Sequence, residues 1–270
     1  MAFLQLKDVS FTYPNGFQAV QHINMQFDLG ESVAIIGQNG AGKTTTVKLM
    51  NALLKPTSGE VLINGENTSQ FTTAQVSKKV GYVFQNPDDQ IFHSDIYSEI
   101  AFGPKNQKLP ASEVKEKALH AAELCGLTKW LEEHPYNLPY AMRKFITIAA
   151  VIAMDTDIII LDEPTAGQDR HATKLLVDLI NHLTAQGKTV ITITHDMEFV
   201  ANHFNRVIVM AEKQVLRDAN AREVFWDHEL LGKSHLKQPY ISQLAYSLNL
   251  NEPIITLDEM VSAVKRRINS

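Results

Sequence analysis

The stretch GQNGAGKT, residues 37–44, joins a short apolar run, residues 32–36, to a segment with helical periodicity, residues 43–54. It matches the pattern G-x-x-x-x-G-K-[ST], in which glycines let the backbone curl so that its N–H groups face phosphate oxygens. A helix that begins at the loop adds the positive end of its dipole. The order strand, loop, helix therefore predicts an α/β fold with a phosphate-binding site at the end of a buried strand.

Two side chains of the loop have expected roles. Lys43 should reach the β- and γ-phosphates of a nucleotide, and the Thr44 hydroxyl should coordinate Mg²⁺. The alternative is a glycine-rich turn that matches the pattern by chance, which the flanking strand and helix disfavour. The predicted nucleotide contacts are Gly37, Gln38, Asn39, Gly40, Ala41, Gly42, Lys43, Thr44 and Thr45.

A second apolar run ends in two adjacent acids, in the stretch IIILDE at residues 158–163. We expect Asp162 to support Mg²⁺ and Glu163 to orient or deprotonate an attacking water. The alternative is a solvated strand end, or a cap for the helix that follows. His195 comes just after another apolar run, residues 189–193, and should lie at the same edge of the sheet, because the carboxyl ends of such strands converge.

The rest of the pattern surrounds these motifs. Alternating segments at residues 3–11 and 19–29, separated by YPNG at residues 13–16, predict two strands and a turn. Residues 87–153 are mostly helical, which indicates an inserted subdomain, and short amphipathic pieces follow from about residue 220. The other expected elements are strands at residues 59–65, 158–161, 189–193 and 207–210, and helices at residues 112–125 and 139–154.

Composition limits the partners and the surroundings of such a protein. The net charge of −5 argues against a nucleic-acid partner, which would favour a basic face. Cys125 is the only cysteine, so no intramolecular disulfide is possible, which fits a reducing cytosol. The first residues, MAFLQLKD, lack the layout of a signal peptide, and the apolar run at residues 146–154 is too short to cross a bilayer.

In their order along the chain, the motifs resemble those of the ATPase subunit of an ATP-binding cassette (ABC) transporter. Tyr13 resembles the aromatic residue that stacks on adenine, and residues 37–44 resemble Walker A. Gln85 in VFQNP resembles the Q-loop glutamine, and Asp162 and Glu163 resemble Walker B and its catalytic glutamate. Residues 166–169 resemble the D-loop, and His195 resembles the switch histidine. The resemblance implies ATP and Mg²⁺ as ligands. The implied catalytic residues are Lys43, Gln85, Glu163 and His195, and the implied metal site is Thr44, Gln85 and Asp162.

The same resemblance implies the domain organisation. Residues 1–220 should form a P-loop NTPase (RecA-like) core with an N-terminal antiparallel β subdomain and the helical insertion at 87–153. Residues 221–270 should form a helical, dimer-stabilising extension.

Within that family, QNPDDQIF at residues 85–92, AFGPKN at 101–106 and the tail from VFWDHELL at 224–231 are similar to the ATPases of energy-coupling factor (ECF) transporters, which take up vitamins or transition-metal ions. This implies three partners, namely a paralogous ATPase, a transmembrane coupling subunit and a membrane-embedded substrate-binding subunit, and no nucleic acid. It also implies a peripheral place on the cytoplasmic face of the cell membrane. Asp88 and Asp89 could pair with basic residues of the coupling subunit, or lie in a solvated helical turn that favours acids.

The chain departs from the family at the signature motif, L-S-G-G-Q, whose serine and amides hold the γ-phosphate of ATP on the opposite subunit. Here the motif is replaced by Leu138, Pro139, Tyr140, Ala141 and Met142. Proline offers neither a hydroxyl nor an N–H, and losing charge-assisted hydrogen bonds of roughly 1.5–3 kcal/mol each would cripple the contact. We therefore expect an obligate heterodimer, in which the partner supplies an intact signature to this chain's ATP.

Other functions remain as alternatives. An ABC-type ATPase for DNA repair or chromosome organisation would carry coiled-coil or basic insertions, and the sequence has neither. The chain could instead serve another ABC transporter, or a soluble biosynthetic scaffold. A nucleotide-binding regulatory subunit with little hydrolysis is a further alternative, although such a subunit would have no need of Glu163 or His195.

Overall fold

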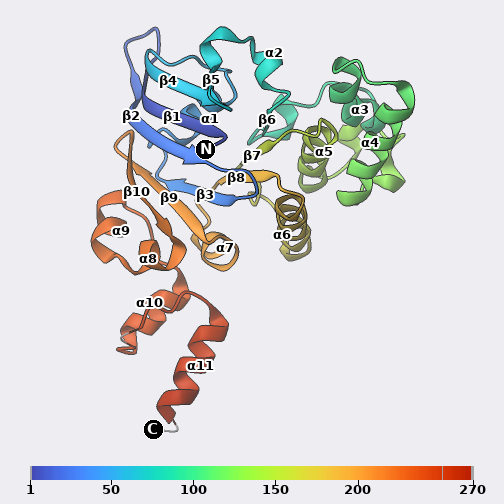
Figure 1. The fold of residues 1–270 in the computed structure, drawn as a ribbon. Coiled ribbons are helices and arrows are strands. Elements are labelled where there is room, and N and C mark those ends of the chain that lie inside the picture. The colour runs from blue at the N-terminus through green and yellow to red at the C-terminus, as the bar shows by residue number, and fades with distance from the viewer. Residues whose placement is uncertain (1, 251, 269–270) are drawn as a thin grey trace.

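The structure is a computed structural model that describes residues 2–250 and 252–268. Its centre consists of an antiparallel sheet and a mostly parallel sheet that lie against each other (Figure 1). A group of helices projects to one side of the parallel sheet, and the last helices extend away from the body. This arrangement, with its β subdomain, helical insertion and C-terminal helices, confirms the predicted fold class.

The antiparallel sheet has the order β2-β1-β4-β5. Its strands are β1 (Leu4–Thr12), β2 (Gln18–Phe27), β4 (Ser58–Ile63) and β5 (Glu66–Asn67). A two-residue turn joins β4 to β5, and its residues Asn64 and Gly65 have φ angles of 50° and 82°. Positive φ at both positions is what a type I′ hairpin turn requires, so Asn-Gly fits it with little strain.

The second sheet has the order β10-β9-β3-β8-β7-β6, and β10 is its antiparallel member. The strands are β3 (Ser32–Gly37), β6 (Val80–Val83), β7 (Ile158–Asp162), β8 (Thr189–Ile193), β9 (Arg206–Ala211) and β10 (Gln214–Asn220). β7 and β3 both pair with β8, and Ile193 is in register with Asp162 on one side and with Ile35 on the other. The carboxyl ends of β3, β7 and β8 therefore lie side by side.

Each face of this sheet has its own apolar core. In β3, Val33 and Ile35 pack with residues of the antiparallel sheet, while Ala34 and Ile36 pack with the helices on the opposite face. Strands buried on both faces have near-continuous apolar runs, as SVAII and IIIL do. The helices around the sheet are α1 (Lys43–Met50), α2 (Thr73–Val76), α6 (Arg170–Ala185) and α7 (Met197–His203).

Helix α1 is shorter than its periodicity predicts: it ends at Met50, whereas the pattern continues to residue 54. The Asn51 side chain accepts a hydrogen bond from the Leu53 N–H (3.1 Å), and Ala52 is left-handed with φ 58°. A side chain that binds the backbone two residues ahead favours a turn over further helix.

The helical insertion contains α3 (Ile96–Asn106), α4 (Ala111–Leu124) and α5 (Tyr140–Ala153), which pack together through residues such as Ile100, Ala118 and Ile146. Three short 3₁₀ segments flank these helices, η2 (Pro87–Asp89), η3 (Thr128–Trp130) and η4 (Pro135–Asn137), while η1 (Thr68–Gln70) follows β5 of the antiparallel sheet. Asp155 ties the insertion to the sheet, since its carboxylate pairs with Lys117 of α4 (3.0 Å) and with Lys188 (2.5 Å), which precedes β8.

The final segment is helical: α8 (Ala221–Trp226), α9 (His228–Ser234), α10 (Tyr240–Ser247) and α11 (Leu257–Ile268). β10 ends at Asn220, and residues of α8 and α9 such as Phe225 and Leu231 still belong to the main core, so the expected start of the extension at residue 221 stays a prediction. α10 and α11 share a small core of their own, formed by Ala245, Leu250, Ile254, Met260 and Ala263. Within residues 2–250 and 252–268, no helix has the length and apolar content needed to cross a membrane.

Candidate functional site

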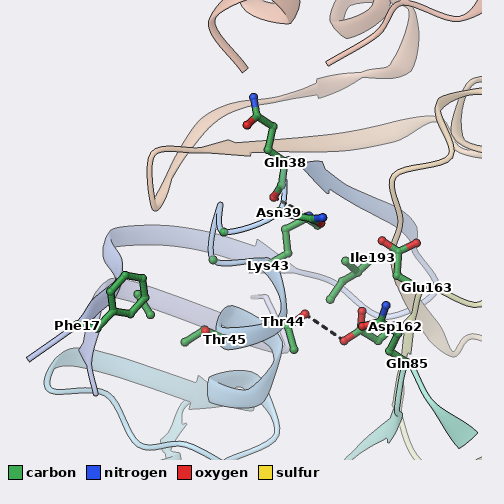
Figure 2. Close-up of a pocket in the computed structure, with 13 residues that line it drawn as sticks. Phe17, Gln38, Asn39, Lys43, Thr44, Thr45, Gln85, Asp162, Glu163 and Ile193 are labelled. Carbon is green, nitrogen blue, oxygen red and sulfur yellow. Dashed lines mark hydrogen bonds between the residues drawn. The ribbon is translucent and has the colours of Figure 1, made fainter. Parts of the chain in front are cut away.

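A cavity of about 220 Å³ opens where the carboxyl ends of β3 and β7 meet the start of α1 (Figure 2). Phe17 lies at one end of it, and Asp162 and Glu163 lie at the other, with the glycine-rich loop between them. The lining residues are Phe17, Ala19, Gln38, Asn39, Gly40, Gly42, Lys43, Thr44, Thr45, Gln85, Asp162, Glu163 and Ile193.

The glycine-rich loop is folded around the Lys43 side chain. Its Nζ donates hydrogen bonds to the backbone oxygens of Gly37 (2.6 Å) and Gln38 (3.0 Å). Burial lowers the pKa of Lys43, and the nearby Glu163 and Asp162 carboxylates oppose that shift. Gly42 begins α1 with φ 98°, and a Cβ there would lie 2.6 Å from Cγ1 of Val20. The loop thus needs glycine at this position, both for its backbone angle and for its close contact with β2.

Asp162 lies at the end of β7 and is almost fully buried. Its Oδ2 accepts hydrogen bonds from the Thr44 hydroxyl (3.2 Å) and from the Tyr82 hydroxyl (2.7 Å). Burial raises the pKa of Asp162, and these hydrogen bonds act in the opposite direction. A buried carboxylate beside a threonine hydroxyl is a site at which a cation would offset the cost of desolvation.

Glu163 and His195 form the adjacent part of the site. Glu163 Oε1 lies 2.8 Å from His195 Nδ1, and the His195 backbone N–H donates to Glu163 Oε2 (3.4 Å). The Glu163 side chain is 9% exposed, whereas the His195 side chain is 71% exposed. The carboxylate is therefore held inside the cavity by a histidine at its rim.

Most residues predicted from the sequence line the cavity, and four do not. Gly37 lies behind the loop and accepts the Lys43 hydrogen bond, and Ala41 is buried. His195 acts on the cavity through Glu163. Tyr13 packs behind Phe17, with ring centroids 6.4 Å apart, and its hydroxyl lies 3.3 Å from Thr45 Oγ1. The role of Tyr13 at adenine stays a prediction.

Four residues of the site were not predicted from the sequence: Phe17, Ala19 and Ile193 line the cavity, and Tyr82 contacts Asp162. Phe17 is 51% exposed at the cavity wall. Its position directly after the YPNG turn was the sequence signal that could have indicated a role in ligand contact. Tyr82 lies 80 residues from Asp162 along the chain, and β6 and β7 bring the two together as neighbours in the parallel sheet. No local spacing indicates this contact.

The donor set fits Mg²⁺ and a nucleotide. Hydroxyl, carboxylate and amide oxygens, from Thr44, Asp162 and Gln85, are the ligands that Mg²⁺ prefers, while the phosphates supply the rest. In the part of the chain that the structure describes, no group of three or more His, Cys, Asp or Glu residues forms a metal site. Thr44, Asp162 and Gln85 would hold magnesium at this cavity together with phosphate oxygens.

Comparison with known families agrees with this geometry. The sequence profile of the ABC transporter family matches residues 20–166, which include the glycine-rich loop and both acids. The chain belongs to the ABC transporter family. A relative from Methanosarcina mazei, whose name places it among ABC transporter ATP-binding proteins, is 40% identical over 92% of this chain, but the chain spans only 42% of its length.

Two other similar proteins match nearly end to end. The "Energy-coupling factor transporter ATP-binding protein EcfA" of Methanocaldococcus jannaschii is 36% identical, over 99% of this chain and 97% of its own. The solved structure of cbiO1 from Clostridium perfringens, described as part of the ABC transporter complex cbiONQ, has a TM-score of 0.78 and 32% identity, and the alignment covers 91% of this chain and 99% of that one.

The replaced signature of this ABC chain opens α5. Pro139 is its N-cap and makes no side-chain capping hydrogen bond. The Ala141 carbonyl accepts a hydrogen bond from Gln168 Nε2 (3.2 Å). Tyr140 packs against Gly167, where a Cβ would lie 3.4 Å from the Tyr140 ring. The start of α5 is thus docked on the segment at residues 166–169.

Proposed function

We propose that this chain is the ATP-binding and ATP-hydrolysing subunit of a membrane transporter, of the energy-coupling factor type that takes up a vitamin or a transition-metal ion. The observation that carries the proposal is the meeting of Lys43, Thr44, Asp162 and Glu163 at one cavity. The names of the Methanocaldococcus jannaschii relative and the Clostridium perfringens structure support the transporter type.

Different residues of the cavity bind the phosphates, position the attacking water and hold the metal ion. The backbone N–H groups of the loop and the Lys43 ammonium bind the β- and γ-phosphates, and this lysine exchanges its carbonyl partners for phosphate oxygens. Glu163 accepts a proton from, or orients, the attacking water, while His195 holds the carboxylate in place. Bound Mg²⁺, held by Thr44 and Asp162 with Gln85 beside them, would neutralise charge on the phosphates.

The assembly is a heterodimer with a paralogous ATPase. The replaced signature, residues 139–142, gives no hydroxyl to the partner's ATP, whereas this chain's own phosphate loop and acids are complete. Two copies of this chain would contain two sites without a signature serine. The other proposed partners are a transmembrane coupling subunit and a membrane-embedded substrate-binding subunit, which place the chain on the cytoplasmic face of the cell membrane. Helices α8–α11 are proposed to stabilise the dimer.

The catalytic assignment is tested in the transporter complex purified from membranes. Glu163→Gln keeps the size of the side chain and removes its basicity, so most ATP turnover should be lost while nucleotide binding persists. Near-normal hydrolysis would show that the partner's site carries the activity.

The heterodimer is tested by comparing the purified chain with the complex. Affinity purification from membranes should recover a second ATPase and membrane subunits with this chain. The chain alone should hydrolyse ATP far more slowly than the complex, and equal rates would contradict the heterodimer.

A further inference from the structure

Lys144 is a buried cation in the first turns of α5, only 2% exposed. Its Nζ donates a hydrogen bond of 2.6 Å to the backbone oxygen of Glu163, and lies 5.8 Å from the centre of the Tyr140 ring. Burial lowers the pKa of Lys144, and the charges of Glu163 and Asp162 oppose that shift. Burying a lysine ammonium is costly in free energy unless a specific partner offsets it. The hydrogen bond to Glu163 is that partner, which indicates a specific role for the contact.

Glu163 has a backbone that needs support. Its φ is 48°, in the left-handed region that residues other than glycine rarely adopt. It also precedes Pro164, whose ring disfavours helical backbone angles in the residue before it. Such a conformation persists only where the surroundings hold it.

The surroundings hold Glu163 from both sides. Its N–H donates to the Ile193 oxygen (2.8 Å), which ties it to β8. Its carbonyl accepts from Lys144 Nζ (2.6 Å) and from the Ala166 N–H (3.3 Å). One side of this turn is thus fixed by the sheet, and the other by a helix of the insertion.

We propose that Lys144 is a positioning residue that holds Glu163 in its left-handed conformation and so keeps the Glu163 carboxylate directed at His195 and the cavity. The inference rests on the proposed role of Glu163 in hydrolysis. It links this chain's own catalytic residue to the docking of α5, the helix that carries the replaced signature. Release of α5 from this turn would therefore weaken hydrolysis at the chain's own site even though the phosphate loop stays intact.

The test uses three variants in the complex that hydrolyses ATP. Lys144→Met keeps the length and apolar packing of the side chain and removes the donor, and it should lower kcat by about tenfold or more while changing the KM for ATP by less than about threefold. Lys144→Arg restores a donor and should recover part of kcat. Lys174→Met is the matched control in α6, because Lys174 is 73% exposed and pairs with Asp178, and its kcat should equal that of the wild type.

A second measurement does not depend on hydrolysis. In the chain alone, hydrogen–deuterium exchange of the peptide that covers residues 160–170 should be faster in Lys144→Met than in the wild type and the Lys174 control. If the methionine variant does not fold, Lys144→Leu, which also lacks a donor, is expected to have the same effects.

The outcomes separate this inference from the proposed function. Wild-type kcat and wild-type exchange in Lys144→Met overturn the positioning role, provided that Glu163→Gln has lost turnover. An equal loss in the methionine and arginine variants, with exchange unchanged at residues 160–170, also overturns it. Normal turnover in Glu163→Gln overturns the proposed hydrolysis at this chain's own site, on which the inference rests, whatever the lysine variants do.

Discussion

Arg143 and Asp88 form an ion pair across the start of the helical insertion, with Nη1 2.7 Å from Oδ1. Asp88 lies in η2, just after the glutamine of the cavity, and Arg143 lies in α5, just after the replaced signature. The guanidinium also lies over the rings of Tyr136 (5.1 Å) and Tyr140 (5.5 Å). The Asp88 carboxylate therefore has a partner within its own chain, and its pairing with a basic residue of a membrane subunit stays a prediction.

The first prediction concerns this pair. Asp88→Asn should lower the free energy of unfolding by about 1–2 kcal/mol, because Arg143 would lose its charged partner while Arg143 Nε is already buried without a hydrogen bond. Denaturant unfolding of the purified chain measures the change.

Asp89→Asn is the matched control, since Asp89 Oδ1 accepts from Asn86 Nδ2 (3.2 Å), which asparagine can replace in part. Its stability should stay close to that of the wild type. If Asp88→Asn keeps wild-type stability but fails to assemble with the membrane subunits, the result would instead support a contact between Asp88 and the coupling subunit.

The contacts of Asp88 and Lys144 illustrate what the sequence could not predict. Periodicity and motif spacing predict β3, its loop and α1, because their signals are local and adjacent. The convergence of Asp162 and His195 also follows from the sequence, because the carboxyl ends of parallel strands share an edge. Those predictions required only the order of strands and helices.

Contacts between side chains far apart in sequence depended on the packing of the insertion. Arg143 lies 55 residues from Asp88, and Lys144 Nζ reaches a backbone oxygen 19 residues away. Nothing in NLPYAMRK indicates that its two cations face inward, and basic residues on a helix are usually solvated. Helix α3 was likewise not predicted from the sequence, because Gly103 and Pro104 disfavour helix locally. The tertiary packing of the insertion tolerates both residues.

The second prediction concerns the base of the nucleotide. Phe17→Ala should weaken ATP binding by about tenfold, because stacking of a base on an aromatic ring is worth roughly 1–3 kcal/mol. Binding of inorganic triphosphate should be unchanged, since it has no base. Equilibrium binding of the two ligands measures both.

Leu29→Ala is the control for the loss of an exposed apolar side chain, because Leu29 is 48% exposed and does not line the cavity. Tyr13→Ala distinguishes the two aromatic residues. A loss of base-dependent affinity confined to Tyr13→Ala would place adenine on Tyr13, as the family resemblance implies.

The third prediction is a pH dependence in the C-terminal helices. Hydrogen bonds from Arg222 and from the Ile255 and Thr256 N–H groups lower the pKa of Glu259 from 4.5 to about 2, although partial burial opposes them. A carboxylate whose pKa is depressed by folding stabilises the folded state fully above its ordinary pKa. That stabilisation is lost as the pH falls from 4.5 to about 2.

Glu259→Gln should therefore destabilise the chain by about 1 kcal/mol at neutral pH, since a partly exposed ion pair contributes little more. The difference from the wild type should shrink at about pH 3. Denaturant unfolding at both pH values tests this. Glu229→Gln removes an exposed pair with Lys233 and serves as control; a difference that persisted at the lower pH would contradict the assignment.

The fourth prediction restores the signature. Pro139→Ser, Tyr140→Gly, Ala141→Gly and Met142→Gln together return a hydroxyl, free amides and two glycines to the start of α5, and leave the ion pair of Arg143 and the contact of Lys144 in place. ATP turnover of the complex should rise by up to about twofold, because the partner's nucleotide gains charge-assisted hydrogen bonds at the second site.

The restored chain should also hydrolyse ATP without its partner, which the unmodified chain should not, because a homodimer of the restored chain would contain two complete sites. Two glycines in a helical turn cost about 1 kcal/mol each, so the stability of the variant is measured alongside its turnover. A second variant, with Glu163→Gln added, separates the two sites: the complex should then keep the gained activity, because that activity depends on the partner's own acids. If the four substitutions raise neither rate in a folded chain, the asymmetry inferred from residues 139–142 is wrong.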